Sequence, residues 1–166
     1  QTEQDTRHFS RFSKLPCFDP SSAQEAYEMI QEAFEYSEKY GTPVFLRPTT
    51  RVCHGYASIM VKDETEYTHH QPEGFIKDSK RWVIFPRLSF MNHKKIEARN
   101  QELSDIFSSY EKNTIHPSCD AFKDSKKGIA TGGISYTYTM ETLKKTGMVK
   151  TLKIATPHPF PEKLAV

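Results

Sequence analysis

Hydrophobic and polar residues between Leu15 and Leu46 follow the order strand, helix, strand. The apolar run Leu15–Phe18 ends at Asp19-Pro20-Ser21-Ser22, a cluster typical of a turn and of a helix start. From Ser22 to Lys39 apolar residues recur at helical spacing, and Gly41 supplies a left-handed stop. Pro43–Leu46 has the composition of a buried strand. The pattern predicts an α/β unit.

Two pairs of residues at the start of this predicted helix have the spacing of a capping box. They are Ser21 with Gln24 and Ser22 with Glu25. In such a box the hydroxyl accepts a hydrogen bond from the free N–H of the third helical residue. Either pair fixes the helix start to within one residue.

The middle of the chain has no sustained period between Pro48 and Arg81, which predicts a linker and a domain boundary. Trp82–Phe85 is a short apolar run stopped by Pro86, and it predicts a strand. A helix is expected from about His93 to Lys112, because apolar residues form one edge of that stretch and charged residues cover the rest.

The last third of the chain predicts a second α/β unit. Asn113–Lys127 is rich in turn-forming residues. Gly128–Gly133 leads into a helix that ends near Gly147, and Val149–Ala155 has the composition of a strand. Two units this short do not complete a sheet each, so the missing strands are expected outside the chain or from a partner.

Composition and charge exclude some classes of protein. The chain has 166 residues with 23 Lys and Arg against 21 Asp and Glu, so its formal net charge is only +2. This balance does not favour a nucleic-acid-binding protein, and no run reaches the ~18 to 20 apolar residues that a membrane span requires. Cys17, Cys53 and Cys119 form no close pair, which favours a reducing compartment and predicts a cytoplasmic protein.

A dense charged cluster precedes the first predicted strand. Asp5, Arg7, His8 and Arg11 are interleaved with Phe9 and Phe12. The planar guanidinium group matches a carboxylate with two hydrogen bonds, so a loop with two arginines is suited to hold an oxo-acid substrate. The alternative is a solvated turn in which the two phenylalanines anchor the loop to the core.

Metal and nucleotide motifs are weak. Cys53, His54, His69 and His70 are metal-capable, but their spacing is not that of a structural zinc site, so no metal site is predicted. Gly128–Gly133 matches neither the dinucleotide fingerprint nor the Walker loop, which favours close packing of a strand on a helix. No nucleophile elbow is present, and neither Cys17 nor Cys119 lies in a nucleophile signature.

Three early blocks and two later ones together resemble a known family. The early blocks are EQDTRHF with RFSKLP (residues 3–16), DPSS with QEAY (19–27) and PVFLRPTTRV with His54 (43–54). The later ones are KRWV (80–83) and GIATGGISY (128–136) with TPHPFP (156–161). In order and separation they are similar to the alpha subunit of indolepyruvate ferredoxin oxidoreductases.

The resemblance implies a thiamine diphosphate enzyme that oxidatively decarboxylates arylpyruvates, forms aryl-acetyl coenzyme A and passes electrons through 4Fe-4S clusters to ferredoxin. It implies a beta subunit as partner. It further implies that residues 1–54 end a pyrimidine-binding domain, 55–81 form a linker, 82–127 a connecting strand and helix, and 128–166 begin a transketolase C-terminal-like domain of Rossmann type.

Family residues for thiamine diphosphate, magnesium and the iron-sulfur clusters have no counterpart between Gln1 and Val166, so the segment alone is expected to be inactive. Related oxidoreductases hold the substrate with an arginine before the strand and helix. Arg11 matches that residue by position, and Arg7 is the competing choice. Two alternatives remain open: an oxidoreductase of the same superfamily for branched-chain 2-oxo acids or 2-oxoglutarate, and a non-catalytic α/β module that binds a partner protein.

Overall fold

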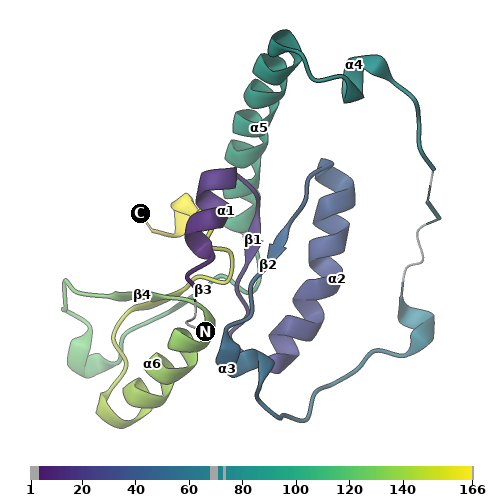
Figure 1. Cartoon of the computed structure of the whole chain (residues 1–166). Coiled ribbons are helices and arrows are strands. Elements are labelled where there is room, and N and C mark those ends of the chain that lie inside the picture. Colours follow the sequence, from purple (N-terminus) through teal and green to yellow (C-terminus); the bar gives the residue numbers. More distant parts are fainter. Residues whose placement is uncertain (1–3, 68–70, 73, 166) are drawn as a thin grey trace.

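A computed structural model describes residues 4–67, 71–72 and 74–165 as a mixed α/β arrangement with two small sheets (Figure 1). In the first, β1 (Cys17–Phe18) pairs in parallel with β2 (Phe45–Leu46). In the second, β5 (Thr151–Lys153) lies between β3 (Thr114–His116) and β4 (Ile129–Thr131). It is antiparallel to β3 and parallel to β4. The α/β class predicted from the sequence is confirmed.

Helix α2 (Ala23–Tyr40) connects β1 to β2, as the sequence predicts. Of the two possible capping pairs, the structure selects Ser22, whose hydroxyl accepts from Glu25 N at 3.2 Å. The Glu25 carboxylate turns back to Ser21, whose amide and hydroxyl both donate to Oε2 at 2.9 and 2.8 Å. Gly41 ends the helix in the left-handed conformation at φ +54°. Local signals therefore determine both ends of this element.

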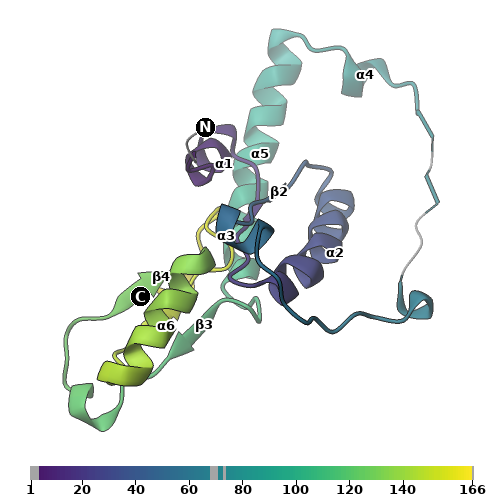
Figure 2. The ribbon, with the colours of Figure 1, turned by 60° about the horizontal axis from the view of Figure 1, so that its bottom comes forward.

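The two sheets are joined through the backbone of the C-terminal segment. Cys17 N donates to His158 O and Asp19 N donates to Ala155 O, each at 2.7 Å. β1 therefore pairs with β2 on one side and forms an isolated antiparallel bridge with His158, which follows β5, on the other. Figures 1 and 2 show α6 (Gly133–Thr146) alongside the three-stranded sheet.

The core lies where α2 and α5 (Pro86–Phe107) pack on β1. Phe18, fully buried, makes edge contacts with Tyr36, Phe107 and Tyr110 at ring-centroid distances of 5.5 to 5.8 Å. Each fully buried large apolar side chain of this kind contributes roughly 1.5 to 3 kcal/mol. The remaining buried members of this cluster are Met29, Ala33, Leu103 and Ala155.

The strand predicted at Trp82–Phe85 is wrong. Helix α4 (Ser79–Trp82) occupies its start, Val83 to Phe85 is irregular, and Pro86 is the first residue of α5. Proline is suited to a first helical position because it has no N–H to leave unpaired. No strand of the described part of the chain lies next to this run, and its side chains are 47 to 65% exposed. Helix α5 thus begins seven residues before the predicted His93, and it ends at Phe107 instead of Lys112.

Two further predictions need correction. The loop expected between Arg7 and Arg11 is helix α1 (Arg7–Ser13), closed by Lys14 in the left-handed conformation at φ +58°. The turn-rich stretch Asn113–Lys127 contains strand β3 and the 3-10 turn η2 (Asp120–Phe122). Phe9 and Phe12 are 58% and 90% exposed, so they do not anchor α1 to the core.

The described residues between α3 (Thr50–Cys53) and α4, called the arch below, lie beside α2 and apart from the core in both views (Figures 1 and 2). The one regular element of the arch is the turn η1 (Glu64–Glu66), within the part of it that the structure describes. A last short turn, η3 (Glu162–Leu164), follows β5 near the end of the chain. In the described ranges no helix combines the length and the apolar composition that crossing a membrane requires.

Candidate anion-binding site

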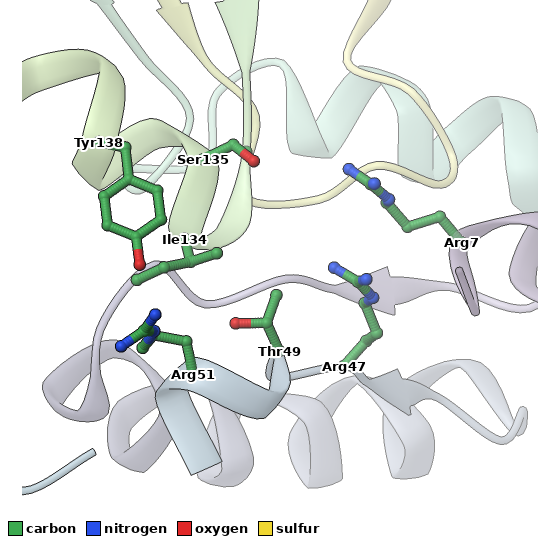
Figure 3. A pocket seen from close by; sticks show the side chains of 8 residues that line it. Arg7, Arg47, Thr49, Arg51, Ile134, Ser135 and Tyr138 are labelled. Carbon is green, nitrogen blue, oxygen red and sulfur yellow. The ribbon is translucent and has the colours of Figure 1, made fainter. Parts of the chain in front are cut away.

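A cavity of 330 Å³ lies between the two α/β units (Figure 3). Its walls come from three places in the sequence: α1, the connection from β2 to α3, and the first turns of α6. The lining residues are Arg7, Arg47, Thr49, Arg51, Gly132, Ile134, Ser135 and Tyr138. Three of the eight are arginines, so the cavity is suited to an anion.

The β-α-β topology explains why these side chains meet. Arg47 directly follows β2, and Thr49 and Arg51 lie two and four residues further on, at the start of α3. Gly132 follows β4 and is the N-cap of α6. Loops that follow the carboxyl ends of parallel strands are the usual place for a ligand in open α/β sheets. The cavity therefore lies where topology alone would place a binding site.

Two of the arginines are held by carboxylates. Arg7 binds Asp5 with two parallel hydrogen bonds, Nε to Oδ1 and Nη2 to Oδ2, both 2.8 Å. Arg47 Nη1 lies 3.2 Å from Oδ1 of the buried Asp19. These pairs fix the directions of both guanidinium groups, which Figure 3 shows on the same side of the cavity.

The pKa values of Asp5 and Asp19 shift in opposite directions. The hydrogen bond from Arg7 lowers the pKa of Asp5 to about 2, with a smaller opposing effect of burial. Burial raises the pKa of Asp19, and Arg47 and Arg7 oppose that shift. Asp19 is 1% exposed, and its Oδ2 has no hydrogen-bond partner within the described part of the chain.

Arg51 and Thr49 differ from the other polar lining residues. Among the residues that the structure describes, the Arg51 side chain makes no ion pair or hydrogen bond, and it is solvent-exposed. Thr49 is 8% exposed, and its Oγ1 is buried with no hydrogen-bond partner in the described ranges. A buried hydroxyl without a partner costs free energy unless something else binds it.

Gly132 and Gly133 let α6 start against two other segments. A Cβ at Gly133, where φ is +53°, would lie 2.7 Å from Asp19 Oδ1. A Cβ at Gly132 would collide with Ile154 O. The glycines therefore allow close packing of the start of α6, against the residues that directly follow β5 and β1. No side chain caps the N-terminus of α6, whose positive dipole end lies at the cavity.

The two arginines singled out in the sequence are separated by the structure. Arg7 lines the cavity, whereas Arg11 is exposed on α1 and is not among the lining residues. Arg11 lies close enough to His158 to contribute, after burial, to lowering the pKa of that imidazole. The substrate-binding role of either arginine stays a prediction.

The metal-capable residues do not come together. Cys53 and His54 are exposed at the end of α3, and His69 and His70 lie outside the described residues. In the part of the chain that is described, no group of three or more His, Cys, Asp or Glu side chains converges on a point suited to a metal ion.

Sequence reasoning missed Arg47, Thr49, Arg51, Asp19 and Tyr138. A signal for the first three was present, because the RPTTR segment follows a buried strand and the carboxyl ends of parallel strands gather polar ligands. The burial of Asp19 and the position of Tyr138 depend on how α6 docks, which no local pattern contains.

Comparison with known proteins gives matches along nearly the whole chain, although no protein-family model matches it. The chain is 36% identical to indolepyruvate oxidoreductase subunit IorA of Pyrococcus abyssi, over 97% of its own length and 25% of that protein. It is 35% identical to the same subunit of Methanothermobacter thermautotrophicus and 31% identical to that of Archaeoglobus fulgidus, in both cases over 99% of its own length and 26% of theirs.

These matches confirm the resemblance expected from the sequence blocks. The chain spans about a quarter of the length of the curated relatives it matches. The aligned part includes α1, both parallel strands of the first sheet and the start of α6, and so every residue that lines the cavity lies within it.

Proposed function

We propose that the chain is a segment of the alpha subunit of an indolepyruvate ferredoxin oxidoreductase. The complete enzyme oxidatively decarboxylates indolepyruvate and other arylpyruvates, forms aryl-acetyl coenzyme A and transfers the electrons to ferredoxin. The observation that carries the proposal is the 31 to 36% identity with subunits named for indolepyruvate oxidation, over nearly the whole chain. A cytoplasmic location and a beta subunit as partner belong to the same proposal.

The cavity supports an oxo-acid substrate. A 2-oxo acid carries one carboxylate, and arginine binds carboxylates with short, charge-assisted hydrogen bonds. Arg7 is held at the rim by Asp5 in a fixed direction, so its remaining N–H donors need little reordering to meet a ligand. We propose that Arg7 contacts the carboxylate of the substrate. Arg11 is the second candidate for this contact.

Thiamine diphosphate, magnesium and 4Fe-4S clusters belong to the proposed complete enzyme, where thiamine diphosphate would supply the electron sink that decarboxylation of a 2-oxo acid requires. Among the described residues, no group of three or more His, Cys, Asp or Glu side chains is placed to hold a metal ion. The proposal therefore assigns the cofactors to other parts of the enzyme, and the segment alone has no catalytic activity.

The test is the substrate profile of the complete enzyme with its partner subunit. Coenzyme A-dependent reduction of ferredoxin is measured with indolepyruvate, phenylpyruvate, 2-oxoglutarate and 3-methyl-2-oxobutanoate. We expect arylpyruvates to have the highest kcat/KM. A preference for 2-oxoglutarate or the branched-chain acid assigns the protein to another oxidoreductase of the superfamily. No oxidation of any 2-oxo acid supports the non-catalytic module instead.

Replacing Arg7 or Arg11 by Gln tests the site in the same enzyme. Loss of a charge-assisted contact costs about 1.5 to 3 kcal/mol, so the arginine that contacts substrate should raise KM or lower kcat/KM by ~10-fold or more. Unchanged kinetics for both variants would remove the predicted role of both residues.

A further inference from the structure

The cavity contains a cation and a buried hydroxyl that no described residue uses, and both lie on the connection from β2 to α3. Thr49 Oγ1 is buried without a hydrogen-bond partner, and the Arg51 side chain has no ion pair or hydrogen bond in the described ranges. Figure 3 shows both side chains directed into the cavity from the same segment. The buried Thr49 hydroxyl without a partner indicates a bound ligand, and the exposed Arg51 places a cation on the same wall of the cavity.

The charge of the cavity determines what kind of anion fits. Three arginines line it, and the carboxylates of Asp5 and Asp19 bind two of them. Among the residues that the structure describes, no carboxylate balances the positive charge of Arg51, and the positive end of the α6 dipole adds to that charge. A single carboxylate neutralises this excess, whereas a phosphate dianion would overcompensate it.

The wall beside Arg51 is apolar. Ile134 and Tyr138 lie one turn apart on α6, and Figure 3 shows both side chains next to the Arg51 guanidinium. Tyr138 is 48% exposed, so a ligand ring can cover its face and remove apolar area from water. This surface accommodates a planar hydrophobic group attached to the carboxylate.

We infer that the cavity is a binding site for a monoanionic aryl carboxylate, with Arg51 as the cation that binds the carboxylate, Thr49 as hydrogen-bond donor to it, and Ile134 and Tyr138 as the surface for the ring. The choice of an aryl group rests on the proposed function, and the charge argument does not. Here Arg51 makes the main contact with the carboxylate and Arg7 a secondary one, because Asp5 already binds Arg7 with two hydrogen bonds, and Arg11 does not line the cavity.

Three probes test the inference on the 166-residue chain by NMR titration of backbone amides. They are 3-phenylpropanoate, its uncharged amide, and inorganic phosphate. We expect 3-phenylpropanoate to bind and to shift the amide signals of Thr49 to Arg51 and of the first turn of α6. The uncharged amide should bind at least 10-fold more weakly. Absence of binding by 3-phenylpropanoate, or tighter binding of phosphate, would overturn the monoanion assignment.

Two variants identify the residues responsible. Arg51→Gln should weaken 3-phenylpropanoate binding by ~10-fold or more, the usual effect of losing a charge-assisted hydrogen bond. Arg87→Gln removes an exposed arginine far along the chain, at the start of α5, and should leave the affinity within twofold. Equal affinities of wild type and Arg51→Gln would overturn the role of Arg51.

Thr49 is buried, so Thr49→Val is compared with Thr49→Ser to separate binding from folding. Thr49→Ser retains the hydroxyl and should retain the affinity for 3-phenylpropanoate, whereas Thr49→Val should weaken it about fivefold. The amide signals away from the cavity should be unchanged in both variants, which shows that the fold is intact. Equal affinities for the two variants would remove Thr49 from the site. Binding that persists in a protein whose complete enzyme oxidises no arylpyruvate would refute the proposed function and leave this site standing.

Discussion

Glu25 in α2 and Lys153 in β5, 128 positions apart in the sequence, form an ion pair that joins the two α/β units. Their side chains are 17% and 8% exposed, and the Lys153 ammonium also lies 4.8 Å from the centre of the Tyr136 ring. Since both partners are largely removed from water, neither charge can be removed alone without leaving the other poorly solvated.

Glu25→Gln should destabilise the chain by about 3 kcal/mol, because the Lys153 charge loses its partner. Urea denaturation followed by circular dichroism measures this change. Glu35→Gln, on the exposed side of the same helix, is the matched control and should change the free energy of unfolding by less than ~0.5 kcal/mol. Equal stability of Glu25→Gln and wild type would show that the pair contributes nothing net.

The same pair predicts a pH dependence. Burial alone would raise the pKa of Glu25, but hydrogen bonds from Lys153 and Ser21 outweigh it and lower the pKa below its ordinary value of 4.5. A carboxyl with a lowered pKa contributes stability that is present above the unfolded value and is lost as the pH falls through the folded one. The free energy of unfolding of the wild type should therefore decrease as the pH is lowered below 4.5. In parallel urea titrations, Glu25→Gln should lack this part of the pH dependence.

Gly133 and Gly41 have nearly the same positive φ, +53° and +54°, but different surroundings. A Cβ at Gly41 meets no atom within 4 Å, whereas one at Gly133 meets the Asp19 carboxylate. Gly41→Ala measures the strain of a left-handed residue alone, roughly 1 to 2 kcal/mol. Gly133→Ala should cost clearly more in thermal or urea unfolding, and equal costs would mean that Asp19 moves aside freely.

Asp5 limits the charge of the cavity by binding Arg7. Because the pKa of Asp5 is lowered to about 2, the pair stays ionised throughout the neutral range, and its stabilisation is lost only as the pH falls from about 3.8 toward 2. Asp5→Asn should free the Arg7 guanidinium and raise the affinity for 3-phenylpropanoate several-fold at pH 7, as measured by NMR titration. An unchanged or lower affinity would show that Asp5 serves only to orient Arg7.

The three cysteines should react with thiol reagents in a defined order. Cys17 is fully buried in β1, and burial, with Asp19 nearby, raises the pKa of its thiol to about 12. Cys53 is exposed and Cys119 is intermediate. Mass spectrometry after a short treatment of the native chain with iodoacetamide should find Cys53 modified and Cys17 intact, with Cys17 reacting only in denaturant. Rapid native modification of Cys17 would contradict the buried position of β1.

The first α/β unit could be predicted because its signals are local. A cap at Ser22, helical spacing through Lys39 and a glycine at position 41 each act within a few residues. The strand predicted at Trp82–Phe85 is wrong because a strand depends on a distant partner. β-forming side chains give a strand only where another strand offers hydrogen bonds, and here Pro86 begins a helix directly after the run.

The site was predictable only in part. The sequence predicted Arg7 as a carboxylate-binding residue, but the carboxylate that it binds in the structure is that of Asp5, two positions away. The burial of Thr49 and the place of Arg51 in the cavity wall depend on the docking of α6 against the other unit. Such relationships between distant segments have no counterpart in local spacing.

The described residues of the arch contact α2 where Gln24 and Tyr27 bind the backbone N–H groups of Met60 and Lys62. The core, the ion pair of Glu25 with Lys153 and the backbone pairing of β1 with the C-terminal segment all lie outside it. A single proteolytic cut in the arch should therefore leave two fragments that remain associated. Fragments that have been separated should associate again when they are mixed. The covalent continuity of the chain is thus less important for this structure than the contacts between its two ends.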